Sequence, residues 1–262
     1  METHEAYADP ELAALYDLVY DGFDDDVPLY ENFARRGELP SLELGVGSGR
    51  VALHLARSGL SVVGIDTSLH MLARVEAALD RETAPRLRLV EGDMRDFGLG
   101  GERFDLIYCA FDTWEHLLTP EDQLSSLRCV AKHLAKGGVF VAQLRLLTSV
   151  DWSVGLRPLA LEWTRRDPAS GELVTKLIGG RASPAQQTTT DVLIFDRMPA
   201  DGGAVRRRTF EGTLRVTGRF EMELLLQRAG LRLAGLYGGT DLSPFDDAGD
   251  TMVIVAEPGV HT

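Results

Sequence analysis

Apolar positions recur at helical spacing near the start of the chain, and short strands and helices alternate after it. Residues 10–20 carry an apolar residue every three or four positions, and Asp9 followed by Pro10 suits the first turn of a helix. We expect strands at 41–44, 62–65, 87–90, 104–110 and 139–146. We expect helices at 51–58, at 69–79, and from the N-cap Thr119 to a glycine cap at Lys136-Gly137-Gly138. This alternation predicts a parallel sheet that is covered on both faces.

Residues 150–216 break this rhythm. Four β-like runs, separated by turn signals rich in Asp, Gly and Pro, lie at 159–166, 172–178, 188–197 and 205–215. They predict an antiparallel meander inserted into the α/β body, and its natural role is to cover the active face. Because the meander is polar and rich in arginine, we do not expect it to fold alone.

The α/β pattern then resumes with a helix at 217–229 and strands at 231–236 and 251–256. From this helix we expect an inward-facing set formed by Phe220, Met222, Leu224 and Leu225. Only the loop 238–250 joins the last two strands, and it is too short and too rich in Asp, Gly and Pro for a crossover helix. The two strands must therefore be antiparallel neighbours, which is an unusual and informative end to a parallel sheet.

Composition narrows the class of protein. The chain has 262 residues, of which 27 are basic and 40 acidic, giving a net charge of −13 that disfavours binding to phosphate backbones. No apolar run approaches the ~20 residues that span a bilayer, and the N-terminus lacks the pattern of a signal peptide. Two cysteines cannot form a disulfide scaffold or a four-ligand zinc site. We expect a cytoplasmic protein without nucleic-acid or membrane partners.

A glycine-rich turn follows the first expected strand, where parallel sheets bind ligands. Gly45, Gly47 and Gly49 let the backbone approach a ligand, and the next helix offers free N–H groups. Asp66 lies 21 residues after Gly45 at the tip of the second strand, the usual place for an acid that binds a ribose diol. The dinucleotide fingerprint G-x-G-x-x-G would require glycine where this chain has Arg50, so a nicotinamide dehydrogenase is disfavoured.

Three motifs together carry a resemblance: LELGVGSGR at 42–50, VGID at 63–66, and EGDMRDF at 91–97. With the antiparallel final pair, the chain resembles class I S-adenosylmethionine-dependent methyltransferases. The aromatic N-terminal helix and the inserted sheet are most similar to bacterial small-molecule N-methyltransferases that act on amino sugars or glycine. The resemblance implies an α/β, Rossmann-like seven-stranded sheet with a final antiparallel strand, an inserted β meander and an N-terminal lid helix. We divide the chain into lid helices (1–40), a cofactor-binding core (41–149), an inserted β lid (150–216) and the completion of the core sheet (217–262).

The resemblance also implies the cofactor, S-adenosylmethionine, with S-adenosylhomocysteine as its product. Gly45 and Gly47 would approach its methionine part, Asp66 would accept both ribose hydroxyls, and Asp93 would bind the adenine amino group. The full implied set is Glu43, Gly45, Gly47, Gly49, Arg50, Asp66, Thr67, Met71, Asp93, Met94 and Ala110. Within it Glu43 would help to orient the cofactor's amino group, and Met94 with Met71 would flank the adenine ring.

The segment after the fourth strand, AFDTWEHLL at 110–118, lies beside the expected methyl group. It lacks the Asn/Asp-Pro-Pro-aromatic motif of enzymes that methylate bases, which counts against nucleic acids as substrate. His116 is the candidate base, and the alternative is that it only packs against the lid or caps the turn. Further catalytic candidates are Tyr16, Tyr20 and Glu115, with Asp112 as another acid at similar depth. Candidate substrate-binding residues are Phe111, Trp114, Arg145 and Tyr237.

The sequence therefore predicts a methyltransferase that acts on an amine nitrogen of a small-molecule metabolite. O-methylation of a hydroxylated or phenolic metabolite, or cofactor binding without turnover, are the alternatives. We expect a monomer or homodimer. The six histidines are scattered and no acidic cluster has suitable ligand spacing, so we expect no metal site.

Overall fold

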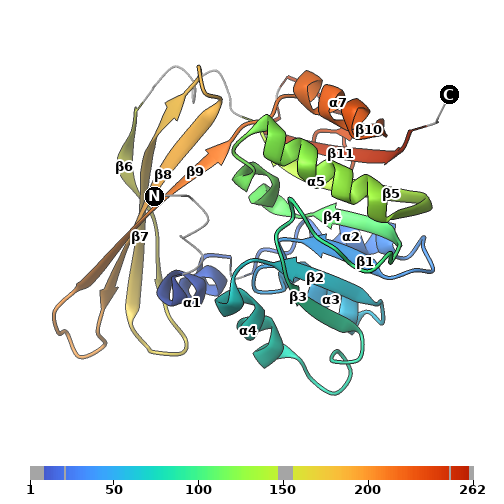
Figure 1. Ribbon diagram of the computed structural model, residues 1–262. Helices are drawn as coiled ribbons and strands as arrows, with labels where there is room; N and C mark the ends of the chain where they lie inside the picture. Colours follow the sequence, from blue (N-terminus) through green and yellow to red (C-terminus); the bar gives the residue numbers. More distant parts are fainter. Residues whose placement is uncertain (1–8, 21, 147–155, 248, 260–262) are drawn as a thin grey trace.

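The computed structural model describes residues 9–20, 22–146, 156–247 and 249–259, which form two sheets (Figure 1). The larger is a seven-stranded sheet in the order β10-β11-β5-β4-β1-β2-β3. Its strands are β1 (Ser41–Leu44), β2 (Val62–Asp66), β3 (Leu87–Glu91), β4 (Phe104–Cys109), β5 (Leu134–Arg145), β10 (Leu231–Tyr237) and β11 (Thr251–Pro258). The first five are parallel, and β11 runs antiparallel to both β5 and β10. The predicted α/β fold with an antiparallel last strand is confirmed.

Two layers of helices cover the sheet, as strands that are apolar on both faces require. One face packs against α2 (Val27–Ala34), α3 (Arg50–Arg57) and α4 (Leu69–Ala78). The other packs against α5 (Pro120–His133) and α7 (Arg219–Arg228). Alternation along β1 divides its residues between the faces: Leu42 and Leu44 join the α5/α7 layer, so Glu43 faces the α2/α3 layer. No helix among the described residues is long and apolar enough to span a membrane.

The N-terminal helix α1 (Pro10–Val19) is held by the inserted sheet. The Asp9 side chain accepts a 2.8 Å hydrogen bond from the N–H of Glu11, and Pro10 occupies the first turn, as the sequence predicts. Leu12 and Leu15 pack against Val174, Phe195 and Phe210 of the inserted sheet. The helix therefore lies between the two sheets rather than on the surface of the core.

The inserted sheet has the order β6-β7-β8-β9, and all its pairs are antiparallel. Its strands are β6 (Leu156–Arg166), β7 (Leu173–Ser183), β8 (Thr188–Met198) and β9 (Arg206–Arg215). The predicted meander is confirmed, but β7 runs five residues beyond its expected end at 178. Gly179 and Gly180 continue the pairing with β8, and a Cβ at Gly180 would overlap the carbonyl of Thr190. These glycines permit close strand packing instead of ending the strand.

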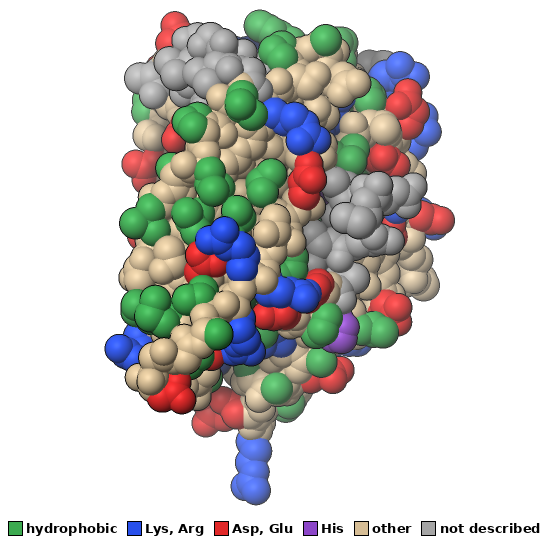
Figure 2. Space-filling view, turned by 90° about the vertical axis from the view of Figure 1, so that its left-hand side faces the viewer, with side chains coloured by type: hydrophobic (Ala, Val, Ile, Leu, Met, Phe, Trp, Pro, Cys, Tyr) green, Lys and Arg blue, Asp and Glu red, His purple; other side chains and the backbone are tan. Residues whose placement is uncertain are grey.

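One face of the inserted sheet is turned away from the core, and Figure 2 shows it. Hydrophobic side chains on this face alternate with ion pairs such as Arg207–Asp196 and Arg181–Glu211, at 2.6 and 3.0 Å. Leu159 and Leu161 of β6 are more than half exposed there. The opposite face carries Val174, Phe195 and Phe210 and meets α1.

Two local predictions were wrong. Helix α5 ends at His133 and not at Gly137-Gly138, because Leu134 turns extended and pairs with Phe104 at the start of β5. In α7, Phe220 and Leu224 are 71% and 61% exposed, whereas Met222, Leu225 and Leu226 are buried. The buried stripe starts at Met222 and repeats every three or four residues, so Phe220 and Leu224 belong to the solvent side.

Candidate active site

A cavity of about 390 Å³ lies at the carboxyl ends of the core strands, where open α/β sheets bind ligands. The core contributes the loops after β1 to β4 and the end of β5. The α1 helix contributes Leu12, Tyr16, Val19 and Tyr20, and all four strands of the inserted sheet contribute residues. The inserted sheet and α1 therefore cover the ligand-binding edge of the core, as the sequence predicts.

The floor of the cavity is the glycine turn between β1 and α3. Gly45 and Gly47 have φ values of +68° and +54°, which glycine adopts without strain. A Cβ at Gly45 would overlap Cγ2 of Thr113, and a Cβ at Gly47 would point into the cavity, 3.9 Å from the Tyr16 hydroxyl. Only glycine leaves both the backbone geometry and this space intact.

Asp66, at the end of β2, faces the same turn. Its Oδ2 accepts a hydrogen bond from the N–H of Gly47 and its Oδ1 accepts one from the N–H of Ser68, both at 2.8 Å. Burial raises the pKa of Asp66, while the N–H groups of Ser68, Gly47 and Thr67 act in the opposite direction. The carboxylate is thus fixed at the cavity wall with lone pairs still available to a ligand.

These features fit S-adenosylmethionine. The turn leaves free space where any side chain would intrude, and Asp66 offers a fixed carboxylate to a ribose diol. Met71 and Met94 also line the cavity, as does Asp93, whose carboxylate is held by the Arg95 side chain at 2.6 Å. The residues predicted to hold the ribose and adenine are therefore brought together.

Aromatic rings form the wall opposite the glycine turn. The rings of Tyr16 in α1 and of Tyr20, the C-cap of α1, contact each other in a tilted arrangement at a centroid distance of 4.6 Å, and Tyr20 meets Phe111 edge-on at 5.3 Å. Phe111 opens the short 3₁₀ helix η2 (Phe111–His116), with a φ of +52° that side chains rarely adopt. The strained residue turns its ring toward α1, so the lid helix and the core share one aromatic cluster.

The same 3₁₀ helix brings acids and a histidine to the cavity. Asp112, Thr113 and His116 line it, and Glu115 is buried directly behind. Glu115 accepts a 2.6 Å hydrogen bond from the backbone N–H of Arg145. Burial and the neighbouring Asp112 raise the pKa of Glu115 to about 8, against the opposing effect of Arg145. Arg145, at the end of β5, lines the cavity as predicted.

Four predicted cofactor residues lie outside the cavity lining. Glu43 is buried beneath α2 and α3, where it accepts a 2.9 Å hydrogen bond from the Tyr108 hydroxyl. The guanidinium of Arg50 binds the buried carboxylate of Asp26 and lies 4.9 Å from the Phe23 ring. Gly49 begins α3, and Ala110 is buried just before η2. These residues support the walls from behind, because the strand alternation or the helix direction turns them away from the ligand side.

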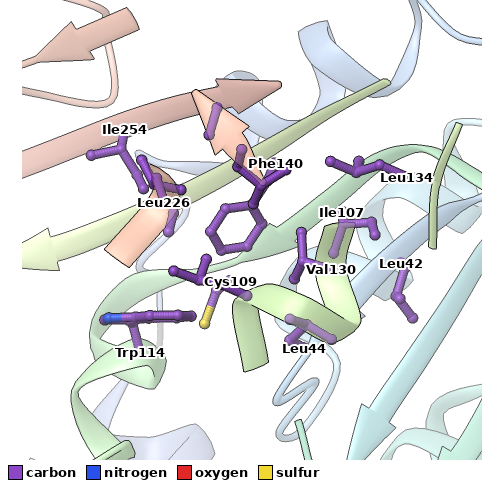
Figure 3. Close-up of a cluster of buried hydrophobic side chains, with 14 of the residues drawn as sticks. Leu42, Leu44, Ile107, Cys109, Trp114, Val130, Leu134, Phe140, Leu226 and Ile254 are labelled. Atoms are coloured by element: carbon purple, nitrogen blue, oxygen red, sulfur yellow. The ribbon is translucent and has the colours of Figure 1, made fainter. Parts of the chain in front are cut away.

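Three other candidates lie off the cavity as well. Trp114 is fully buried in the layer under α5 and α7, against Cys109 and Phe140 (Figure 3). Tyr237 packs back over Gly235 on β10. Glu115 reaches the backbone of β5 and not the cavity surface. Thr113 and His116, the sequence neighbours of Trp114 and Glu115, reach the cavity because successive residues of a tight helix point in different directions.

The sequence reasoning missed the residues that the inserted sheet supplies. Glu162, Lys176 and Asp191 line the cavity from β6, β7 and β8. Side chains alternate between the two faces of each strand, so the sequence offers two candidate sets of residues. The register of the sheet decides which face meets the core, and the pairing of β6 is irregular. No sequence signal could have selected them.

Comparison with known proteins agrees with this geometry. A family model described as a methyltransferase domain matches residues 42–138. The dTDP-3-amino-3,4,6-trideoxy-alpha-D-glucopyranose N,N-dimethyltransferase of Streptomyces venezuelae is 30% identical over 200 residues, covering 76% of this chain and 77% of that protein. The dTDP-3-amino-3,6-dideoxy-alpha-D-glucopyranose N,N-dimethyltransferase of Streptomyces fradiae is 34% identical over 143 residues, covering 51% of this chain and 52% of that protein. In this second match the chain spans about half the length of its relative.

Among solved structures, the CcbJ methyltransferase of Streptomyces caelestis superposes with a TM-score of 0.73 at 26% identity, covering 90% of this chain and 94% of that one. The chain belongs to the methyltransferases, and the residues that line its cavity fit S-adenosylmethionine as the methyl donor.

Proposed function

We propose that this protein transfers a methyl group from S-adenosylmethionine to an amine nitrogen of a small-molecule metabolite. The observation that carries the proposal is the cavity whose floor is the Gly45–Gly47 turn and whose wall holds His116, with α1 and the inserted sheet lying over it. Two relatives of this chain are named for N,N-dimethylation of amino sugars, which supports an amine as the acceptor.

The residues of the chain have three tasks in this reaction. When bound, the cofactor supplies an activated methyl group: the methyl carbon forms a bond to the nitrogen as its bond to sulfur breaks. Tyr16, Tyr20 and Phe111 exclude water and align the acceptor. Asp66 and the glycine turn hold the ribose and methionine parts of the cofactor.

The third task is removal of a proton. An amine attacks only as the neutral base, so an ammonium substrate must first lose one proton. His116 lines the cavity, and imidazole is the side chain whose ordinary pKa lies nearest neutrality. We propose that the imidazole accepts this proton, leaving the nitrogen lone pair for the methyl carbon. The proton on the methylated product leaves afterwards to the solvent.

A product screen by mass spectrometry tests the proposed function. The protein and S-adenosylmethionine are incubated with pooled amines, amino sugars, phenols and a host metabolite extract, with Asp66→Ala as the control. A product one methylene heavier that is missing from the control supports turnover, and its fragmentation distinguishes nitrogen from oxygen. Methylation of phenols or alcohols alone would contradict an amine acceptor.

Three further properties are part of the proposal. The net charge of −13 supports small molecules rather than nucleic acids as substrates. We propose a cytoplasmic monomer or homodimer. We also propose that turnover needs no divalent metal, so that activity in EDTA should equal activity without it; a loss restored by Mg²⁺ would contradict this.

A further inference from the structure

The cavity has more acidic than basic side chains. Six of the residues that line it are Asp or Glu and two are Lys or Arg, but Glu211 of β9 pairs with Arg181 on the outer face of the inserted sheet, which leaves five acids on the cavity side. The residues outside the described ranges contain no Lys or Arg, so they add no cation to this count. A charged ligand in this cavity therefore meets a surplus of negative charge.

Both basic residues of the cavity are already paired with acids. Nζ of Lys176 lies 2.9 Å from Oε2 of Glu162, across two neighbouring strands. Nε of Arg145 lies 3.6 Å from Oε2 of Glu115, and its Nη2 donates a 3.1 Å hydrogen bond to the Thr189 hydroxyl. A phosphate group needs cations or several N–H donors, and binding one here would require breaking these pairs.

Two acids instead face the cavity from opposite walls. Asp112 projects from η2 of the core, and Asp191 projects from β8 of the inserted sheet. Asp191 is paired with Arg157 of β6. Among the described residues, none donates a hydrogen bond to the carboxylate of Asp112 or forms an ion pair with it, and Arg145 acts on it only from beyond ion-pair distance. An unpartnered carboxylate in a partly buried wall is costly unless a ligand satisfies it.

The surroundings of Asp112 make this cost larger. Burial raises the pKa of Asp112, and the charges of Asp191 and Asp250 raise it further, while Arg145 acts in the opposite direction. Glu115 lies on the same 3₁₀ helix, and the charges of Asp112 and Asp191 raise its pKa as well. The described charged groups around Asp112 are thus three acids and Arg145, with Arg157 beyond Asp191. Among the described residues, Arg145 and Arg157 offset this repulsion only in part, and a bound cation would relieve the remainder.

We propose that the cavity takes an amine that is cationic and carries no phosphate, and that Asp112 and Asp191 bind its ammonium group from opposite walls. The role of this site in methyl transfer rests on the proposed function; the preference for a cation does not. The ammonium would dock beside His116, which lines the same cavity and would receive its proton. Because the two relatives described above are named for dTDP-linked amino sugars, the substrate of this chain would differ from theirs in lacking the diphosphate.

Binding of three ligands that share one ring but differ in charge tests the proposal without measuring methyl transfer. The probes are benzylammonium, benzyl alcohol and benzyl phosphate, whose common ring suits the aromatic wall. Each is titrated calorimetrically into the protein saturated with S-adenosylhomocysteine. We expect benzylammonium to bind at least about tenfold more tightly than the other two, as the gain of a charge-assisted hydrogen bond implies.

Two variants test whether the carboxylate of Asp112 causes the preference for benzylammonium. Asp112→Asn keeps the shape and removes the charge, so benzylammonium should bind about tenfold more weakly or worse. Asp196→Asn is the matched control: the same substitution on β8, but on the outer face of the inserted sheet, where Asp196 pairs with Arg207. It should leave the titration unchanged. In the ligand-free protein, Asp112→Asn should leave the melting temperature unchanged or raise it, whereas loss of a structural carboxylate would lower it.

The titrations separate the cation site from its alternatives. Tighter binding of benzyl phosphate, equal binding of all three probes, or a cation preference that survives in Asp112→Asn would overturn the proposal. A preference lost only in Asp112→Asn would support it. If the preference is present but no amine is methylated in the product screen, the proposed function fails and the cation site stands.

Discussion

The backbone N–H of Gly47 donates a 2.8 Å hydrogen bond to Oδ2 of Asp66, which joins the turn after β1 to the end of β2 at the floor of the cavity. A second N–H, from Ser68, binds the other carboxylate oxygen. The acid that faces the ligand is therefore also the group that holds the glycine turn in place.

Substitution of Asp66 should weaken cofactor binding. Asp66→Ala removes the acceptors for the ribose diol, and we expect a loss of about tenfold or more in affinity for S-adenosylhomocysteine by calorimetry. Asp66→Asn should also weaken it, because its NH₂ group would face the N–H of Gly47 or Ser68. Asp201→Ala, in an exposed turn, is the control. Unchanged affinity in both Asp66 variants would mean that the ribose is held elsewhere.

Gly45 should tolerate no side chain. A methyl group there would overlap Cγ2 of Thr113, and the backbone has a φ of +68°. We expect Gly45→Ala to lower both the melting temperature and cofactor affinity. Adding Thr113→Ser removes the clashing methyl group, so the double variant should recover part of the loss but not the strain of about 1 kcal/mol. A single variant as stable as the parent protein would contradict this.

The ion pair between Arg50 and Asp26 should stabilise the fold rather than the cofactor. Asp26 is fully buried, and Nη2 of Arg50 donates a 2.7 Å hydrogen bond to its Oδ2. Arg50→Ala would leave a buried carboxylate unpaired, and we expect a loss of roughly 3–5 kcal/mol in the free energy of unfolding. The surface pair Arg207–Asp196 provides the comparison, because Arg207→Ala should cost less than about 1 kcal/mol. Denaturant titration measures both.

His116 should affect the rate and not cofactor affinity. With the amine found in the product screen, we expect His116→Ala to lower kcat by about a hundredfold or more, the usual contribution of a general base. Its affinity for S-adenosylhomocysteine should stay within a factor of two or so. His54→Ala, on the half-exposed surface of α3, is the control. Turnover at the parent rate in His116→Ala would leave proton removal to Tyr16, Tyr20 or solvent.

Glu43 should make stability depend on pH. Burial raises the pKa of Glu43 from its ordinary 4.5 to about 8, against the hydrogen bond from Tyr108. Between these values the folded chain holds a proton that the unfolded chain has released. Stability therefore falls as pH rises across this window, by up to about 1.4 kcal/mol per pH unit, and levels off above it.

Glu43→Gln isolates this effect. The amide oxygen can still accept the Tyr108 hydrogen bond, but nothing titrates at this position. The variant should match the parent protein near pH 5 and exceed its stability near pH 8, as measured by urea titration at both values. Because the pKa of Glu115 is also raised to about 8, some pH dependence should remain. Equal slopes in variant and parent would show that Glu43 does not titrate in this range.

Local sequence signals determined much of this protein. The glycine spacing at 45–49, the acid at the end of β2 and the alternation of strands and helices identify the fold and the cofactor floor, because each depends on residues close together in the chain. The antiparallel final strand also follows from sequence, since the loop before it is too short for a crossover. The same reasoning places Tyr16, Tyr20 and His116 near the ligand, and the structure brings all three to one cavity.

Tertiary structure alone decided the rest. Whether Glu115 or Asp112 reaches the cavity depends on the direction of a six-residue 3₁₀ helix, which its sequence does not reveal. Arg50 lies beside the glycine turn in sequence, yet it points to Asp26, because helix α3 turns its side chain toward α2. Asp191 is remote in sequence from every motif of the core and meets Asp112 only through the register and packing of the inserted sheet. Side-chain direction and the packing of distant elements are long-range properties, and no local pattern encodes them.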